Sequence, residues 1–118
     1  MKIVYIAGPY GDAGGYLAID RNIARARDAA AWLAEHGIGY YCPHLNSAHF
    51  EAIAPGAPVE FWYAMDLALM PIADALLVLD GWVNSKGTQA EIVEWGKSGK
   101  PMFYDDYDRE MLLEWATP

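Results

Sequence analysis

The sequence has little cysteine, few basic residues and no long apolar run. Cys42 is the single cysteine, which excludes an internal disulfide and any metal site built from several cysteines. No apolar run approaches the length of a membrane span, and Met1-Lys2-Ile3 leads directly into a predicted strand rather than a signal peptide. We therefore expect a soluble, cytoplasmic protein without a membrane partner.

The charge balance restricts the classes of partner. Lys and Arg together number 8, against 16 Asp and Glu, which gives a net charge of -8. Such a balance argues against nonspecific binding of nucleic acid or of an anionic membrane. A small anionic ligand is still compatible with it, because a helix N-terminus can supply the local field.

The remaining composition indicates one globular domain covering residues 1–118. Hydrophobic residues make up 54% and charged residues 20% of the 118 residues, and no internal repeat is found. Strands are predicted over residues 2–7, 39–42, 75–79 and 102–104, and helices over residues 20–36, 59–70, 88–97 and the C-terminal stretch through Trp115. This alternation predicts a three-layer α/β/α sandwich around a flavodoxin-like, doubly wound parallel sheet of four or five strands.

Residues 74–91 contain the most informative stretch. The apolar run 75–79 predicts a strand buried on both faces, and a polar loop with two glycines follows it. A helix is predicted to begin near Thr88 and to carry Glu91 in its first turn. In an open α/β sheet, ligands bind outside the carboxyl ends of the strands, where Ser85 and Glu91 would lie. Glu91 is then either an acid matched to the helix dipole or a carboxylate directed into a crevice.

Two other loops follow strands at the same predicted edge. Residues 8–15 are rich in glycine and include Gly8 and Tyr10; they form either a plain turn or a loop whose backbone approaches a ligand. Residues 43–47 include His44 and Asn46, which either bind a base or sugar or belong to a polar loop. His44 and His49 have no third ligand at a recognisable spacing, so neither a metal nor a cofactor is expected.

The helix predicted over residues 59–70 is rich in aromatic and sulfur-containing side chains. Phe61, Trp62, Tyr63, Met65 and Met70 crowd it, which is more apolar surface than one sheet face is expected to cover. We therefore predict a homodimer through this helix. By default, Asp66 is an exposed acid on the same helix.

Several short motifs carry a resemblance to a known superfamily. Ser85-Lys-Gly87-Thr-Gln-Ala-Glu91 resembles the Ser-x-Gly-x-x-x-Glu signature of the nucleoside 2-deoxyribosyltransferase superfamily, which includes 2'-deoxynucleoside 5'-monophosphate N-glycosidases. Val4-Tyr-Ile-Ala-Gly8 is similar to the first strand of that superfamily. Asp66 also stands eight residues before Asp74, as an active-site aspartate does in these proteins. Together with Gly8-Pro-Tyr10, Asn22-Ile23, Pro43-His-Leu-Asn46 and Gly81-Trp82, these motifs resemble a small phage and bacterial branch of uncertain function.

The resemblance implies a role for each matching residue. Glu91 matches the nucleophile that attacks C1' of the sugar, Tyr5 the tyrosine that holds this carboxylate, and Asp66 the acid that assists the departing base. Ser85 matches the position at which members specific for monophosphates bind phosphate. The resemblance thus implies an N-glycosidase acting on a nucleoside 5'-monophosphate or a nucleoside, by hydrolysis or by base transfer.

The residue types suit this chemistry. A carboxylate stabilises or captures an oxocarbenium-like sugar, and a second carboxyl with a raised pKa protonates the leaving group. One departure concerns phosphate: relatives that bind it carry serine and arginine in the loop after the first strand, where this chain has Pro9 and Gly11. Two alternatives remain, a catalytically silent nucleotide-binding module and a hydrolase of another ribosyl compound such as an ADP-ribose derivative.

Overall fold

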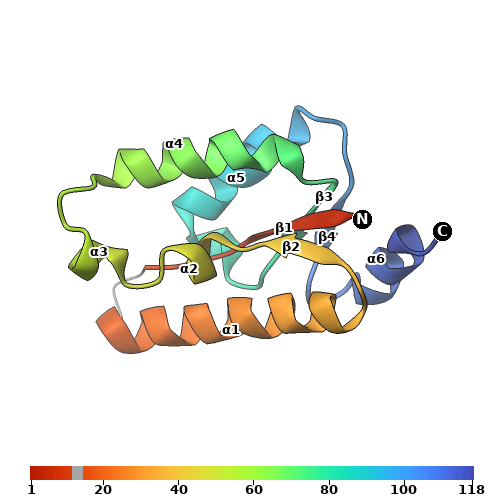
Figure 1. The fold of residues 1–118 in the computed structure, drawn as a ribbon, viewed down its shortest axis with the longest axis horizontal. Coiled ribbons are helices and arrows are strands. Elements are labelled where there is room, and N and C mark those ends of the chain that lie inside the picture. Colours follow the sequence, from red (N-terminus) through yellow and green to blue (C-terminus); the bar gives the residue numbers. More distant parts are fainter. Residues whose placement is uncertain (12–14) are drawn as a thin grey trace.

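The computed structural model describes residues 1–11 and 15–118 and contains the predicted parallel sheet (Figure 1). The strands are β1 (Ile3–Ala7), β2 (Gly39–Tyr41), β3 (Ala75–Val78) and β4 (Met102–Tyr104). The helices are α1 (Gly15–Glu35), α2 (Pro43–Asn46), α3 (Phe50–Ile53), α4 (Val59–Leu69), α5 (Lys86–Gly96) and α6 (Arg109–Ala116), with 3-10 turns η1 (Met70–Ile72) and η2 (Trp82–Asn84). Residues 12–14, in the middle of the predicted glycine-rich turn, lie outside the described part of the chain.

The strands lie in the order β2-β1-β3-β4 and all pairs are parallel. The chain leaves β1 toward β2 on one side and later returns to place β3 on the other side. The switch point of this doubly wound sheet therefore lies between β1 and β3, where the general rule places ligands at the carboxyl ends of the strands. The predicted α/β fold with a flavodoxin-like sheet is confirmed, with four strands among the described residues.

Side chains alternate along each strand and divide the core into two layers. Val4 and Ile6 of β1 face a cluster that includes Leu33 of α1 and Leu112 of α6. Tyr5 faces the opposite cluster, to which α5 contributes Trp95 and Ile92. Figure 1 shows the same division, with α1 and α6 on one side of the sheet and α4 and α5 on the other.

Three features differ from the sequence prediction. Helix α1 begins at Gly15, five residues before the predicted start at residue 20. The earlier start was not predicted because the first turn exposes the apolar side chains of Tyr16 and Leu17, which hide the amphipathic pattern. The short helix α2 lies in the segment 43–47, which was expected to be a loop, and α3 follows in a stretch for which no helix was predicted. Helix α5 begins at Lys86, which moves Glu91 from the predicted first turn into the second.

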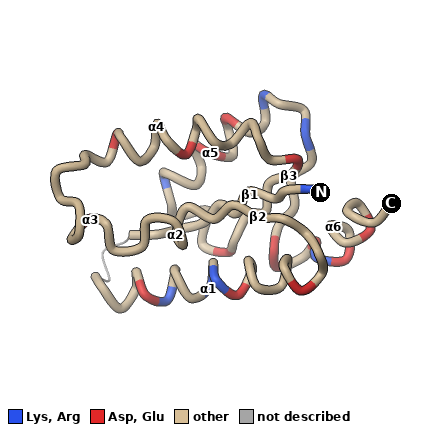
Figure 2. The backbone as a smooth tube through the Cα atoms, viewed as in Figure 1, with Lys and Arg blue, Asp and Glu red and all other residues tan. Residues whose placement is uncertain are grey.

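Charged side chains are distributed over most helices, but α4 carries only Glu60 and Asp66 (Figure 2). Within residues 1–11 and 15–118, none of the helices has both the length and the apolar content that crossing a membrane requires.

Candidate active site

A tyrosine and a glutamate from distant parts of the chain form the centre of the site. Tyr5 lies in the middle of β1, is 0% exposed, and faces the α5 side of the sheet. Its hydroxyl donates a hydrogen bond of 2.5 Å to Oε2 of Glu91, which lies 86 residues later in the sequence. The pair forms only because the fold packs α5 over β1.

Burial sets the protonation of this pair. It raises the pKa of Glu91 to about 7; the negative charge of Asp66 acts in the same direction, whereas the hydrogen bond from Tyr5 lowers the pKa. The pKa of the Tyr5 hydroxyl lies far above its usual value, first because of burial and then because of the charge of Glu91. At neutral pH Tyr5 is therefore a hydrogen-bond donor, and Glu91 is near the midpoint of its titration.

Asp66 brings a second carboxyl to the site from α4. Its side chain is half-buried, and burial raises its pKa to about 6, the direction that the sequence analysis expected. The negative charge of Asp66 also raises the pKa of both Tyr5 and Glu91, so the three groups share one electrostatic environment. Such a set can store a proton for transfer and present an ionised oxygen for attack.

The sequence analysis missed a second tyrosine beside this cluster. Tyr41 lies directly opposite Tyr5 in the register of β1 and β2, with the two ring centroids 5.6 Å apart. Burial raises the pKa of the Tyr41 hydroxyl to about 12, and the charges of Asp66 and Glu91 add to this effect. Tyr41 could have been found from the register of β1 and β2, because residues opposite each other in neighbouring strands share one face of the sheet.

Ser85 and Gly87 organise the start of α5. The Oγ of Ser85 accepts a hydrogen bond from the Thr88 N–H at 3.3 Å and lies 2.8 Å from the Thr88 Oγ1. Ser85 is therefore the helix N-cap, which explains why α5 begins two residues earlier than predicted. A Cβ added at Gly87 would lie 3.6 Å from the Tyr63 hydroxyl, so this position lies against α4. Substrate binding by Ser85 and Gly87 stays a prediction.

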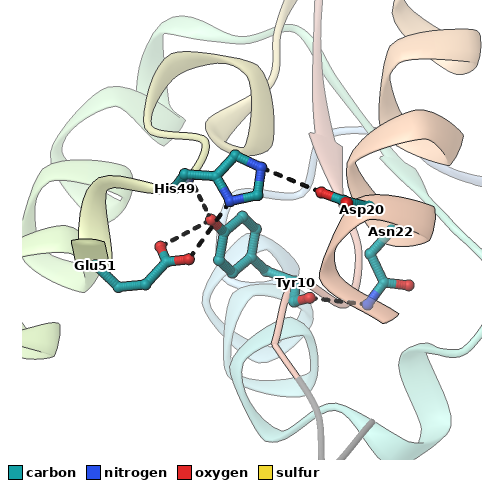
Figure 3. A network of polar contacts seen from close by, with 5 residues as sticks. All are labelled: Tyr10, Asp20, Asn22, His49 and Glu51. Carbon is teal, nitrogen blue, oxygen red and sulfur yellow. Dashed lines mark hydrogen bonds and ion pairs between the residues drawn. The ribbon is translucent and has the colours of Figure 1, made fainter. Parts of the chain in front are cut away.

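The loop after β1 is fixed by close packing and by a polar network. A Cβ added at Gly8 would come within 2.8 Å of the Leu79 side chain, so the loop can lie this close to the end of β3 only with glycine. The Tyr10 hydroxyl donates to Glu51 Oε2 at 2.9 Å and accepts from the His49 N–H at 2.7 Å (Figure 3). Packing alone therefore accounts for Gly8, and the Tyr10 hydroxyl is engaged with the segment at α3.

The same network reaches α1. The His49 Nε2 lies 3.2 Å from the Asp20 Oδ1, and the Asn22 Nδ2 donates to the Tyr10 carbonyl at 2.8 Å (Figure 3). The network thus joins the first loop, α1 and α3. Substrate contact by Gly8 and Tyr10 stays a prediction.

His44 has a structural role. It is 5% exposed, and its Nε2 donates to the Pro9 carbonyl at 2.6 Å, since a carbonyl oxygen can only accept. Burial also lowers the pKa of His44, which keeps the ring neutral. The ring therefore supports the start of the first loop through Nε2, and Asn46 is exposed at the end of α2. Substrate contact by His44 and Asn46 stays a prediction. Among the described residues, no three His, Cys, Asp or Glu side chains are grouped to hold a metal.

Trp82 lies beside a separate hollow at the ends of β3 and β4. Its ring centroid is 5.7 Å from that of Tyr104, and the hollow has a volume of about 280 Å³. The lining residues are Val78, Asp80, Trp82, Val83, Tyr104, Asp106 and Tyr107. Tyr5, Asp66 and Glu91 do not line this hollow, but Trp82 also packs against the buried cluster that contains Tyr5. Substrate contact by Trp82 stays a prediction.

A comparison with known protein families shows to which family the chain belongs. The family model described as Domain of unknown function (DUF7768) matches residues 2–105. This chain belongs to the DUF7768 family. The DUF7768 match contains Tyr5, Asp66 and Glu91 and ends after β4, so α6 lies beyond it. No curated protein matches the chain.

Proposed function

We propose that this DUF7768 protein is an N-glycosidase that cleaves the bond between base and sugar in a nucleoside 5'-monophosphate or a nucleoside. The observation that carries the proposal is the 2.5 Å hydrogen bond from Tyr5 to Glu91, which forms in a cluster that also contains Asp66. The resemblance of the three residues to a nucleophile, its tyrosine and an assisting acid supports the same assignment.

The proposed reaction follows from the two carboxyls. An oxygen of the ionised Glu91 forms a bond to C1' while the bond from C1' to the base nitrogen breaks. The electron pair of that bond remains on the base, and the protonated Asp66 supplies a proton to it. Water then attacks C1' and gives a proton to the ionised Asp66, while the bond from C1' to Glu91 breaks and restores the carboxylate, which gives hydrolysis. A second base that attacks in place of water, and gives its N–H proton to Asp66, results in transfer.

Tyr5 has a distinct part in this scheme. Its hydroxyl is bonded to Oε2 of Glu91, which orients the carboxylate and leaves Oε1 for the attack. The same hydrogen bond lowers the pKa of Glu91 and so increases the ionised fraction. Tyr5 is therefore a positioning residue in the proposal.

Ser85 is the residue that bears on whether the substrate is a nucleotide or a nucleoside. Serine at this position lacks the charge with which an aspartate would repel phosphate, and it lies at the positive end of α5. Its hydroxyl is already engaged with Thr88, however, and the Gln89 N–H donates to the Ser85 carbonyl at 3.0 Å. The N–H groups of Lys86 and Gly87 are then the donors that the first turn offers an anion.

The test is release of free base from a panel of ribonucleosides, 2'-deoxynucleosides and their 5'-monophosphates, followed by chromatography. We expect at least one compound to yield free base, and a second base added in excess to distinguish transfer from hydrolysis. Binding without release from any compound would contradict the proposal and favour a silent nucleotide-binding module. ADP-ribose derivatives are tested separately, and release from these compounds alone would favour the other ribosyl substrate.

We also propose a homodimer through α4. Helix α4 has no buried residue, and Phe61, Tyr63 and Leu67 are 49%, 52% and 42% exposed. Met70 departs from the expected surface because it is buried in η1. With so few charges, the exposed apolar side chains of α4 suit contact with a second copy of the same helix.

Light scattering at high micromolar concentration should give the mass of a dimer, and Phe61→Lys should give that of a monomer. Met111→Lys on α6 is the matched control, because Met111 is a comparably exposed apolar residue at 59% and should leave the dimer intact. A wild-type monomer would contradict this proposal.

A further inference from the structure

The hydroxyl of Tyr41 is buried without a hydrogen-bond partner among the described residues. The Asn46 side chain lies close enough to lower the pKa of this phenol, but it does not reach the geometry of a hydrogen bond. A buried polar group without a partner is unfavourable, and the large majority of such groups in folded proteins are paired. The described residues therefore supply no acceptor for this donor, and a bound ligand could supply one.

The surroundings of Tyr41 restrict what that acceptor can be. The ring packs beside Tyr5, and both carboxyls of the site, Asp66 and Glu91, act on the Tyr41 phenol. An anionic acceptor would be repelled when these carboxyls are ionised. A sugar suits the arrangement, because each hydroxyl can accept from the phenol and donate to a carboxylate.

We propose that Tyr41 is a substrate-binding residue whose hydroxyl donates a hydrogen bond to an oxygen of the substrate's sugar. This inference rests on the proposed N-glycosidase function and names the part of the substrate that the β1/β2 side of the site recognises. The two adjacent phenols then have different partners: Tyr5 holds the carboxylate of Glu91, and Tyr41 holds the sugar that Glu91 attacks.

The test compares Tyr41→Phe with Tyr40→Phe. Tyr40 is the neighbouring residue of β2 and is 45% exposed, so its variant loses the same atom from a solvated position. The probes are ribose, 2-deoxyribose and ribose 5-phosphate, titrated by NMR, with free adenine as a ligand that has no sugar. Thermal unfolding of the ligand-free proteins is recorded in parallel.

We expect Tyr41→Phe to weaken sugar binding about two- to tenfold, the usual effect of one neutral hydrogen bond, and to leave adenine binding unchanged. In the ligand-free protein the melting temperature should stay the same or rise, because an unpaired buried donor has been removed. Tyr40→Phe should change neither property.

Two results would overturn the inference. One is unchanged sugar affinity in Tyr41→Phe, or no sugar binding by the wild type. The other is a lower melting temperature or a loss of folding in Tyr41→Phe alone, which would show that the hydroxyl serves the fold through Asn46. The two proposals fail separately: Tyr41-dependent sugar binding without base release would contradict only the N-glycosidase. Base release with unchanged kcat/KM in Tyr41→Phe would contradict only the role of Tyr41.

Discussion

Glu91→Gln should reduce base release by several orders of magnitude and leave the fold intact. The amide keeps the size of the side chain and can still accept the hydrogen bond from Tyr5, but it cannot form the bond to C1' as a carboxylate does. Removing a covalent nucleophile has effects of about 10⁴-fold or more in well-characterised enzymes. The measurement is the initial rate of base release from the best substrate of the panel.

Glu94→Gln is the matched control for this change. Glu94 lies on the same helix, three residues beyond Glu91, and is exposed in an ion pair with Lys97. An exposed pair contributes little to stability, so this variant should have the rate and the melting temperature of the wild type. Wild-type turnover by Glu91→Gln would remove Glu91 from the chemistry.

Asp66→Asn should both lower the rate and change its dependence on pH. Glu91 must be ionised, and its ionised fraction falls as the pH drops through its pKa of about 7. Asp66 must be protonated, and its protonated fraction falls as the pH rises through its pKa of about 6. The product of the two fractions, and with it kcat/KM, falls below about pH 6 and above about pH 7. The profile is therefore a narrow bell centred between these values, and the productive combination of charges is a minority form of the free protein.

In Asp66→Asn the bell should lose its alkaline limb, because asparagine has no acidic proton to donate or lose. The remaining acidic limb should follow the ionisation of Glu91 alone, with a pKa below about 7, since the negative charge of Asp66 no longer raises it. Loss of a general acid is expected to lower the rate by about 10²- to 10⁴-fold. Glu60→Gln, an exposed acid on the same helix, should keep the wild-type profile. An alkaline limb that persists in Asp66→Asn would show that another group supplies the proton.

The alternation of strands and helices was predictable because hydrophobic periodicity reports it directly. The start of α5 and the presence of α3 were not predicted, and both depend on a single residue. Ser85 caps α5 through its side chain, and α3 follows His49, which adopts a left-handed conformation with φ of 63°. Neither helix start produces a periodic pattern in the sequence, since a single capping side chain determines the first and a single backbone dihedral angle the second.

The candidate site was predictable only in part for a similar reason. Tyr5, Asp66 and Glu91 were identified by resemblance to a superfamily signature, and the structure places them in one cluster. Tyr41 was missed because its position depends on which residue of β2 pairs with Tyr5. The contact of His44 with the Pro9 carbonyl was not predicted either, since it joins two segments that are far apart in the sequence. Contacts of this kind follow from tertiary packing and cannot be derived from local spacing.

The N-glycosidase proposal is tested most directly by comparing release of free base by the wild type and by Glu91→Gln at the same concentration, measured by chromatography over the full panel. The wild type should release base from at least one nucleoside or nucleoside 5'-monophosphate, and Glu91→Gln should release none above background. A folded wild type that releases no base from any compound, or a Glu91→Gln variant that releases it at the same rate, would contradict the account.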